Sequence, residues 1–298
     1  MSRLLIVSAD DLGLTDGVCR AVLAAHQRGI ITSTSLLAVG RSFDFAVRMV
    51  LDHPSLDVGA HLAIVGEDPP LLTAREIPTL VDGRGAFPLS YRTVVLRGLA
   101  RRIDPADVRR EFSAQLQRIL SAGVPVSHLD THQHTHLWPA VGSAVIGLAV
   151  DNNIPAVRTP HSGRPLPVGF GVNLLANRLR SKLDRAGLTT TDGYTGLDEA
   201  GAFDQARFER SLGAFASVAD KPTNKATGEP DANARMRTVE INTHPGEAGD
   251  PDRSRFEWGY RWPDELAMLL APESRELVQR SGFRLGSFED LVSAGGSR

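Results

Sequence analysis

A run of histidines is the part of this chain best suited to metal chemistry. Four of its nine histidines, together with Asp130, occupy every second position from His128 to His136. Alternate side chains of an extended strand point to the same face, so this run would bring a carboxylate and several imidazoles into one space. Imidazole and carboxylate groups are common ligands of divalent transition metals. The run therefore predicts a metal site and favours a metalloenzyme.

Two adjacent carboxylates, Asp10 and Asp11, come soon after the apolar segment Leu4–Val7. Consecutive side chains of a regular strand point to opposite faces, but a bend at the strand end would let both reach one site. One could then bind a metal while the other stays free to accept a proton. The alternative is that one of them caps a turn before Gly13. Because two carboxylates after a buried strand are costly unless they are used, the pair favours function.

Two single histidines follow other predicted strands. His61 comes after a short stretch of small and apolar residues, and taken alone it is as often a hydrogen-bonded core residue as a ligand. His244 precedes a proline, so it could be a turn residue, although a catalytic role is slightly favoured. Within the histidine run, His132 is the best placed because it stands just past the strand end, whereas His128 is expected inside the strand.

The roles of several further residues stay open. His134 and His136 could bind the metal, hold its ligands or contact substrate. Arg158 ends a predicted strand, and it could pair with a site carboxylate and keep it ionised, bind substrate, or be an ordinary rim arginine. Trp258 lies in segment 256–262, which carries two of the three tryptophans. Flat aromatic side chains can stack on sugar rings, but anchoring the last helices on the core is an equal alternative.

The elements that would position these residues alternate between strands and helices. Strands are predicted at 4–7, 30–37, 56–64, 124–130, 154–158, 238–243 and 283–286. Helices are predicted at 16–28, 43–50, 104–123, 140–152, 173–186, 205–216, 263–270 and 274–281. The continuous apolar runs among the strands are typical of a parallel sheet covered on both faces, and the helices show apolar residues at helical spacing.

This alternation predicts an α/β fold. Seven or eight strands in 298 residues indicate a single-domain (β/α) barrel, distorted, that spans residues 1–298. A doubly wound open sheet is the alternative. Residues 65–100 are predicted as a long connection with a lid as one role, and the polar residues 219–237 as a flexible loop.

Both architectures place their sites at the carboxyl ends of strands. The predicted strands end close to Asp10 and Asp11, to His61, to the segment 130–132 and to the segment 242–244. Four separate regions of the sequence are therefore expected to meet at one rim. This convergence is the main structural argument for a site.

The bulk composition excludes several classes of partner. The formal net charge is −2, from 33 basic and 35 acidic residues, so there is no electrostatic case for binding nucleic acid or an anionic membrane. A single cysteine, Cys19, excludes an internal disulfide and fits a reducing cytoplasm. The first apolar run reaches Asp10 too early for a signal peptide, and no later segment is long enough to cross a bilayer. We therefore expect a soluble, cytoplasmic protein.

The sequence closely resembles the YdjC-like carbohydrate deacetylases, the family that includes chitooligosaccharide deacetylases. The matching segments occur in order across nearly the whole chain, at 5–14, 29–35, 58–62, 127–136, 242–245 and 282–287. Two departures are modest. The usual Asp-Ser-His-His-His is Asp-Thr-His-Gln-His at residues 130–134, and the usual Cys-His-Pro is Thr-His-Pro at residues 243–245.

The resemblance implies a barrel-like fold, as in polysaccharide-deacetylase-like proteins, and a set of residue roles. Asp11, His61 and His132 would bind one divalent ion, Mg²⁺ or Zn²⁺, with Asp10 as general base and His244 as a candidate acid. The implied enzyme is a metal-dependent hydrolase that removes the N-acetyl group from an N-acetylated amino sugar or short oligosaccharide. Water activated by the metal would attack the amide carbonyl while Asp10 takes its proton. The expected partner is thus a small sugar, and a homo-oligomer remains open.

Two rival functions fit the same residues. Two histidines and a carboxylate also form non-haem iron oxygenase sites, which need an oxidisable iron and oxygen. A non-catalytic sugar- or metal-binding protein is the other rival. It would bind amino sugars without releasing acetate, and it would give no reason for a second, unligated carboxylate beside the first.

Overall fold

The computed structural model describes residues 3–219 and 237–295. The strands are β1 (Arg3–Leu12), β2 (Ser33–Leu36), β3 (Asp57–Leu62), β4 (His128–Thr131), β5 (Ala156–Val157), β6 (Gly193–Thr195), β7 (Thr238–Thr243) and β8 (Phe283–Leu285). The α-helices are α1 (Asp16–Arg28), α2 (Phe43–Leu51), α3 (Tyr91–Leu99), α4 (Pro105–Ser121), α5 (Pro139–Asp151), α6 (Val168–Arg185), α7 (Gln205–Ala219), α8 (Trp262–Leu270), α9 (Pro272–Arg280) and α10 (Phe288–Gly295). The 3-10 helices η1 (His132–Leu137) and η2 (Pro251–Arg255) follow β4 and β7.

The strands form one curled parallel sheet. Their order is β5-β4-β3-β2-β1-β7-β6, and β8 pairs only with residues 3–5 of β1. The two ends of the sheet meet at an isolated bridge between Ala156 of β5 and Thr189, just ahead of β6. A doubly wound sheet is open at both edges. The curled sheet therefore confirms the predicted α/β fold, a distorted (β/α) barrel.

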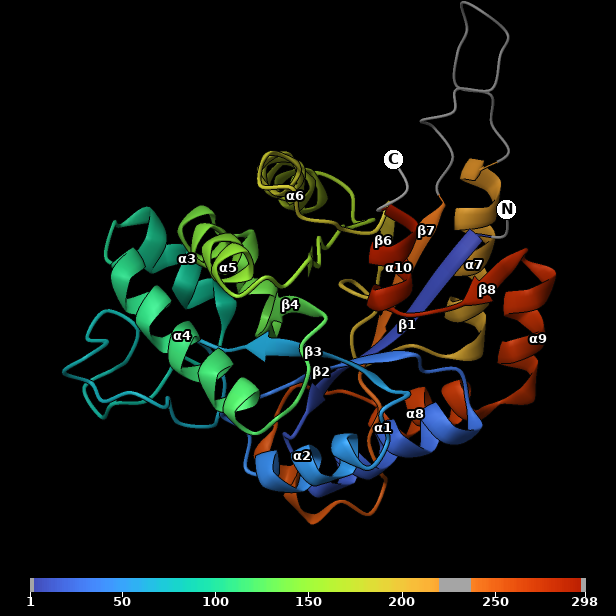
Figure 1. The fold of residues 1–298 in the computed structure, drawn as a ribbon, viewed down its shortest axis with the longest axis horizontal. Helices are drawn as coiled ribbons and strands as arrows, with labels where there is room; N and C mark the ends of the chain where they lie inside the picture. The colour runs from blue at the N-terminus through green and yellow to red at the C-terminus, as the bar shows by residue number, and fades with distance from the viewer. Residues whose placement is uncertain (1–2, 220–236, 296–298) are drawn as a thin grey trace, which may run out of the picture.

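Helices surround the sheet on several sides. Figure 1 shows α1, α2 and α8 along one side, α3 to α5 on another, and α7 with α9 on a third. Leu5, Ile6 and Val7 of β1 are fully buried, as expected for a parallel strand covered on both faces. The first helix has the predicted bounds, because Oγ1 of Thr15 accepts a hydrogen bond from the N–H of Val18 and the helix ends before Gly29.

Three short elements differ from the predicted set. Helix α3 lies within the connection predicted over 65–100, and α10 and β6 were not expected. Only Val94 of α3 is buried, so this helix packs few of its apolar residues on the core, and β6 is three residues long. Apart from its two end residues, the loop predicted over 219–237 lies outside the described residues. In the described ranges, no helix is both long and apolar enough to span a membrane.

Polar side chains of α4 hold the first part of the long connection. Gln115 accepts a hydrogen bond from the N–H of Ala63 (2.8 Å) and donates to its carbonyl oxygen (2.7 Å). Glu111 accepts from the N–H groups of Leu71 (2.9 Å) and Leu72 (3.1 Å). These bonds satisfy backbone groups that no strand pairs. The connection therefore follows a fixed path here, although it has no regular secondary structure.

Candidate metal centre

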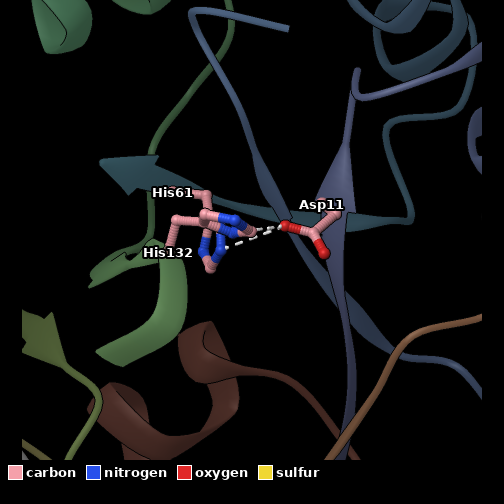
Figure 2. A group of neighbouring side chains, drawn as sticks. All are labelled: Asp11, His61 and His132. Carbon is pink, nitrogen blue, oxygen red and sulfur yellow. Dashed lines mark ion pairs between the residues drawn. The ribbon is translucent and has the colours of Figure 1, made fainter. Parts of the chain in front are cut away.

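The carboxyl ends of β1, β3 and β4 bring three of the predicted ligands together. Oδ1 of Asp11 lies 2.9 Å from Nδ1 of His132 and 3.3 Å from Nε2 of His61. The donor atoms all lie within 4.8 Å of one another, and all three residues are buried. Figure 2 shows both imidazoles pointing toward the same carboxylate oxygen. Residues far apart in the sequence thus meet at one point.

Asp11 reaches this point because β1 is irregular near its end. Its φ is +66°, in the left-handed region that few residues other than glycine adopt. The pairing of β1 with β2 shifts in register between Ala9 and Leu12. Such a bulge re-aims a side chain, and bulges are frequent next to active sites. It explains how Asp10 and Asp11, which would diverge in a regular strand, both come within reach of His61.

The donor set fits a divalent metal ion. Oδ1 of Asp11 is buried and has no hydrogen-bond partner of normal geometry among the described residues. Two imidazole nitrogens and one carboxylate oxygen also leave further coordination positions open. Burial disfavours the ionised form of Asp11, but His132 and His61 lower its pKa well below the usual value. The carboxylate is therefore in the form that binds a cation.

The charge around the centre also favours a bound cation. Four carboxylates are buried here, those of Asp10, Asp11, Asp130 and Glu240. Among the lysines and arginines of the described residues, Arg158 is the one that is fully buried. Burial disfavours the charged form of His61, but the surrounding carboxylates, Asp130 first, raise its pKa to about 10, so a metal ion that binds this ring must displace a proton. Buried acidic groups thus exceed buried basic ones, and a divalent ion would reduce this excess.

Asp130 holds the imidazole of His61 from the side opposite Asp11. His61 and Asp130 are paired in the register of β3 and β4. Nδ1 of His61 lies 2.7 Å from Oδ1 of Asp130 and 3.1 Å from Oγ of Ser35. A carboxylate that accepts a hydrogen bond from one ring N–H fixes the tautomer of the imidazole and leaves the other nitrogen for a metal. Nε2 of His61 is therefore directed at Asp11.

Asp10 lies beside the three clustered residues and is fixed by hydrogen bonds. Oγ of Ser35 donates to its Oδ1 (3.1 Å), and Nη1 of Arg158 and Nδ2 of Asn242 donate to its Oδ2 (2.8 and 2.9 Å). Nε2 of His244 lies 4.0 Å from the same oxygen. These donors compensate the burial of the carboxylate and hold it in one orientation next to the centre.

Arg158 is buried under the site and does not lie on its rim. Its Nη1 is 2.8 Å from Oδ2 of Asp10 and 2.5 Å from Oδ2 of Asp130. Asp10, His61 and Asp130 also have the spacing of metal ligands, but both of these carboxylates already pair with the guanidinium. Burial disfavours the charge of Arg158, but Asp10, Asp130 and Glu240 raise its pKa well above the usual value. Of the three open roles, the structure shows the pairing with site carboxylates.

The alternation predicted for the histidine run stops at Thr131, where β4 ends. In η1, which follows, Gln133 and His134 have φ angles of +51° and +53°. The expectation that the whole run shares one face is therefore wrong, because the backbone turns instead of staying extended. His128 is buried inside the strand as expected, and its ring stacks on Phe288 with 3.7 Å between centroids.

His134 and His136 have different surroundings. Nε2 of His134 lies 3.2 Å from the hydroxyl of Tyr194, and its Nδ1 has no partner within the described part of the chain. Nδ1 of His136 lies 2.6 Å from Oγ1 of Thr131, and its Nε2 lies 3.0 Å from the carbonyl oxygen of Arg158. Burial lowers the pKa of both, that of His136 to about 4. His134 thus has one buried ring nitrogen without a partner in that part of the chain, whereas the fold uses both nitrogens of His136.

His244 lies directly after β7, on the far side of Asp10 from Ser35. Its N–H donates to Oε2 of Glu265 (2.6 Å), and its ring meets that of Tyr260 edge-on, with 5.0 Å between centroids. Nδ1 of the imidazole has no partner among the residues described. The backbone of His244 is therefore fixed, while Nδ1 of its side chain is buried without a partner in this part of the chain.

Trp258 lies next to the metal-ligand cluster. Its ring centroid is 5.3 Å from that of His132, and its Nε1 donates to Oε1 of Glu67 (2.8 Å). The ring also contacts Trp262, the first residue of α8. Segment 253–262 lines a hollow of about 440 Å³. Trp258 therefore anchors this segment, contacts His132 and borders the hollow that the segment lines.

Three residues of the site were not singled out from the sequence. Ser35 lies in the hydroxyl-rich strand β2, which is a weak signal for a polar site. Tyr194 lies in β6, which has too few residues to show a pattern. Glu240 was the clearest missed signal, because it is an acidic residue between Val239 and Ile241 in a predicted buried strand.

Comparisons with known proteins agree with this architecture. The family model described as YdjC-like protein matches residues 4–280. A carbohydrate deacetylase of Brevibacillus brevis is 29% identical over 96% of this chain and 99% of its own length. One of Geobacillus stearothermophilus is 36% identical over 65% of this chain and 77% of its own. A solved structure from Enterococcus faecalis V583, of a candidate cellobiose-phosphate cleavage protein, has 23% identity and a TM-score of 0.74, and covers 98% of this chain and 99% of its own, which shows a shared fold. The chain belongs to the YdjC-like family.

Proposed function

We propose that this protein is a metal-dependent carbohydrate deacetylase, which hydrolyses the N-acetyl group of an amino sugar or short amino-sugar oligomer. One observation carries the proposal. Asp11, His61 and His132 converge beside Asp10, a carboxylate held by donors from outside this group. The Brevibacillus brevis relative named carbohydrate deacetylase, which matches 96% of this chain, supports the same reaction. The pairing of a ligand cluster with a separate proton acceptor is what amide hydrolysis requires.

In this proposal Asp11, His61 and His132 hold one divalent ion, Zn²⁺ or Mg²⁺. When bound, the ion supplies Lewis acidity, which activates water and polarises the acetyl carbonyl. Asp130 and Ser35 keep Nε2 of His61 directed at the ligand cluster. The protein's part is to fix the ligands before substrate arrives, which lowers the cost of reaching the reactive arrangement.

Asp10 and His244 are proposed to move the protons. Asp10 accepts the proton of the attacking water, because its orientation is set by Arg158, Asn242 and Ser35. His244 donates a proton to the leaving amine. Its Nε2 lies 4.0 Å from Oδ2 of Asp10, which places the proposed acid next to the proposed base.

The sugar is proposed to lie against Trp258, in the hollow lined by segment 253–262. The bond from Trp258 to Glu67 holds the indole ring in place for stacking, and an aromatic face suits the apolar face of a pyranose ring. His134 is buried, with Nε2 next to the hydroxyl of Tyr194, so it is proposed to support the site from inside the barrel. His136 also supports the site by joining Thr131 to the backbone of Arg158.

Acetate release tests the proposal directly. Purified protein, stripped of metal by a chelator and reloaded with Zn²⁺ or Mg²⁺, is incubated without oxygen with a panel of N-acetylated mono- and oligosaccharides. We expect acetate release only after metal is added back. In the matched variant Asp10→Asn, metal affinity measured by calorimetry should stay within about threefold while kcat falls by at least about 100-fold. Full activity without metal, a requirement for oxygen, or binding of sugar with no acetate would each reject the proposal.

A further inference from the structure

Glu240 lies in the interior of β7 and is fully buried. Its Oε1 accepts hydrogen bonds from Oγ of Ser8 (2.7 Å) and from Nε of Arg158 (2.8 Å). Nη2 of Arg158 lies 2.8 Å from the same oxygen and donates to Oγ of Ser8 (3.0 Å). Glu240 and Ser8 together therefore hold the Nε and Nη2 edge of the guanidinium.

The opposite edge of the same guanidinium carries the contacts to the site. Nη1 of Arg158 reaches both Asp10 (2.8 Å) and Asp130 (2.5 Å). A guanidinium is planar and rigid, so fixing one edge also fixes where the other edge points. A rotation of Arg158 would therefore move the partner of Asp10 and the partner of Asp130 at once.

We propose that Glu240 is a positioning residue that acts through Arg158 on both Asp10 and Asp130. Because Asp130 in turn holds His61, this one buried carboxylate would set two properties of the site. One is the orientation of the proton acceptor, which rests on the function proposed above. The other is the affinity of the ligand cluster for a divalent ion, which does not.

A purely stabilising role does not explain this arrangement. Buried ion pairs seldom stabilise a fold more than apolar residues of the same size would, and β7 is otherwise paired and packed. Oε2 of Glu240 has no hydrogen-bond partner among the described residues, so part of the desolvation cost is not recovered. Burial is also the main reason that the pKa of Glu240 is raised. Such a cost is common where a group orients a functional residue.

The test compares Glu240→Ala with Glu240→Gln. The alanine variant releases the guanidinium edge, so we expect kcat to fall about 100-fold with KM changed less than about threefold, the effect of a small misplacement of a reacting group. The Kd of metal-free protein for Zn²⁺, measured by calorimetry, should rise about tenfold, as when a group that orients a ligand is lost. Glutamine keeps an acceptor for Arg158 and Ser8, so it should restore kcat and Kd to within about fivefold of the parent.

A control variant and a second mutant background distinguish a positioning role of Glu240 from general destabilisation of the fold. Asp57 is also buried, with its Oδ1 unpartnered among the described residues, but it lies at the start of β3. Asp57→Asn should leave the Kd for Zn²⁺ unchanged. In an Arg158→Met background, Glu240→Ala should have almost no further effect, because the two residues act as one unit.

The outcomes decide between the proposals. Unchanged kcat and Kd in a folded Glu240→Ala protein, or the same loss with and without Arg158, would overturn the role of Glu240. If the alanine variant does not fold, as judged by circular dichroism, Glu240→Met fills the space without an acceptor and gives the same test. If the parent releases no acetate at all, the deacetylase proposal fails, whereas the Zn²⁺ affinities still test Glu240.

Discussion

Nδ1 of His61 and Oδ1 of Asp130 lie 2.7 Å apart at a position where β3 and β4 pair in register. The sheet itself thus places a carboxylate behind a candidate metal ligand. Because the two residues are neighbours on adjacent parallel strands, their distance is fixed by backbone hydrogen bonds and does not depend on a loop. The support of His61 by Asp130 is therefore built into the pairing of two barrel strands.

Asp130→Asn should weaken metal binding while the protein stays folded. Asparagine keeps the size of the side chain but loses the charge that holds the N–H of His61 and pairs with Arg158. We expect the Kd for Zn²⁺ to rise by about 10- to 100-fold, as for other groups that orient a metal-bound histidine. Calorimetric titration of the metal-free variant, with Asp57→Asn as control, measures the change. An unchanged Kd would show that His61 needs no such support.

Removal of the metal should lower thermal stability. An ion that binds only the folded protein at 100 times its Kd stabilises it by about 2.7 kcal/mol. For a chain of 298 residues that corresponds to a rise in Tm of about 4 °C. Calorimetric scans with chelator and with added Zn²⁺ measure the difference. Asp11→Asn, which removes the carboxylate shared by His61 and His132, should show a much smaller rise; an equal rise would place the ion elsewhere.

The burial of His136 should make stability depend on pH. Its pKa is lowered to about 4 in the folded protein, whereas the unfolded chain titrates near the ordinary value of ~6.5. Below that value the unfolded state binds a proton that the folded state does not, so stability falls as the pH drops from ~6.5 to ~4 and this contribution is then constant. The loss from this residue amounts to roughly 3 kcal/mol.

Denaturant titrations of metal-free protein at several pH values test this dependence. His136→Gln lacks the titrating group, so its free energy of unfolding should fall less steeply than that of the parent over the same pH range. Parallel curves for the two proteins would mean that His136 is protonated in the folded state.

Trp258→Leu should weaken binding of the sugar more than it slows the reaction. Loss of an aromatic stacking surface of this kind costs about 0.5–1.5 kcal/mol, so we expect KM for an N-acetylated sugar to rise about 3- to 10-fold with a smaller change in kcat. A small acyclic acetamide has no ring to stack and serves as the control substrate. If kcat/KM falls equally for both substrates, Trp258 supports His132 instead of binding the sugar.

Much of the fold could be predicted from the sequence because the strands are apolar runs between capped helices. The meeting of residues 11, 61 and 132 followed from the same pattern, since parallel strands end at one edge. The predicted bounds of α1 were correct because Thr15 and Gly29 mark them locally. The strand β6 was missed because three residues are too few to show an alternating pattern. The helix α3 was missed because it lies within the connection predicted over 65–100.

The finer arrangement of the site depends on features that a sequence pattern does not contain. The left-handed backbone of Asp11 turns two adjacent carboxylates toward one region, and nothing in the residue types requires it. The turn at Gln133 and His134 likewise breaks the alternation of side chains that the residue types alone suggest for the histidine run. The buried Arg158 pairs with Glu240, 82 residues further along the chain. Contacts over such separations depend on the assembled sheet.

The barrel wall has a narrow seam where β5 meets the segment ahead of β6. The N–H of Val157 donates to the carbonyl oxygen of Thr189 (3.0 Å), and the N–H of Thr189 donates to that of Pro155 (2.9 Å). Because so few backbone hydrogen bonds cross it, this seam is where the barrel should open locally most readily. Arg158 directly follows Val157. Each local opening of the seam would therefore loosen the arginine that pairs with the buried carboxylates. Additional hydrogen bonds across the seam would stiffen the barrel around the candidate site without altering any side chain inside it.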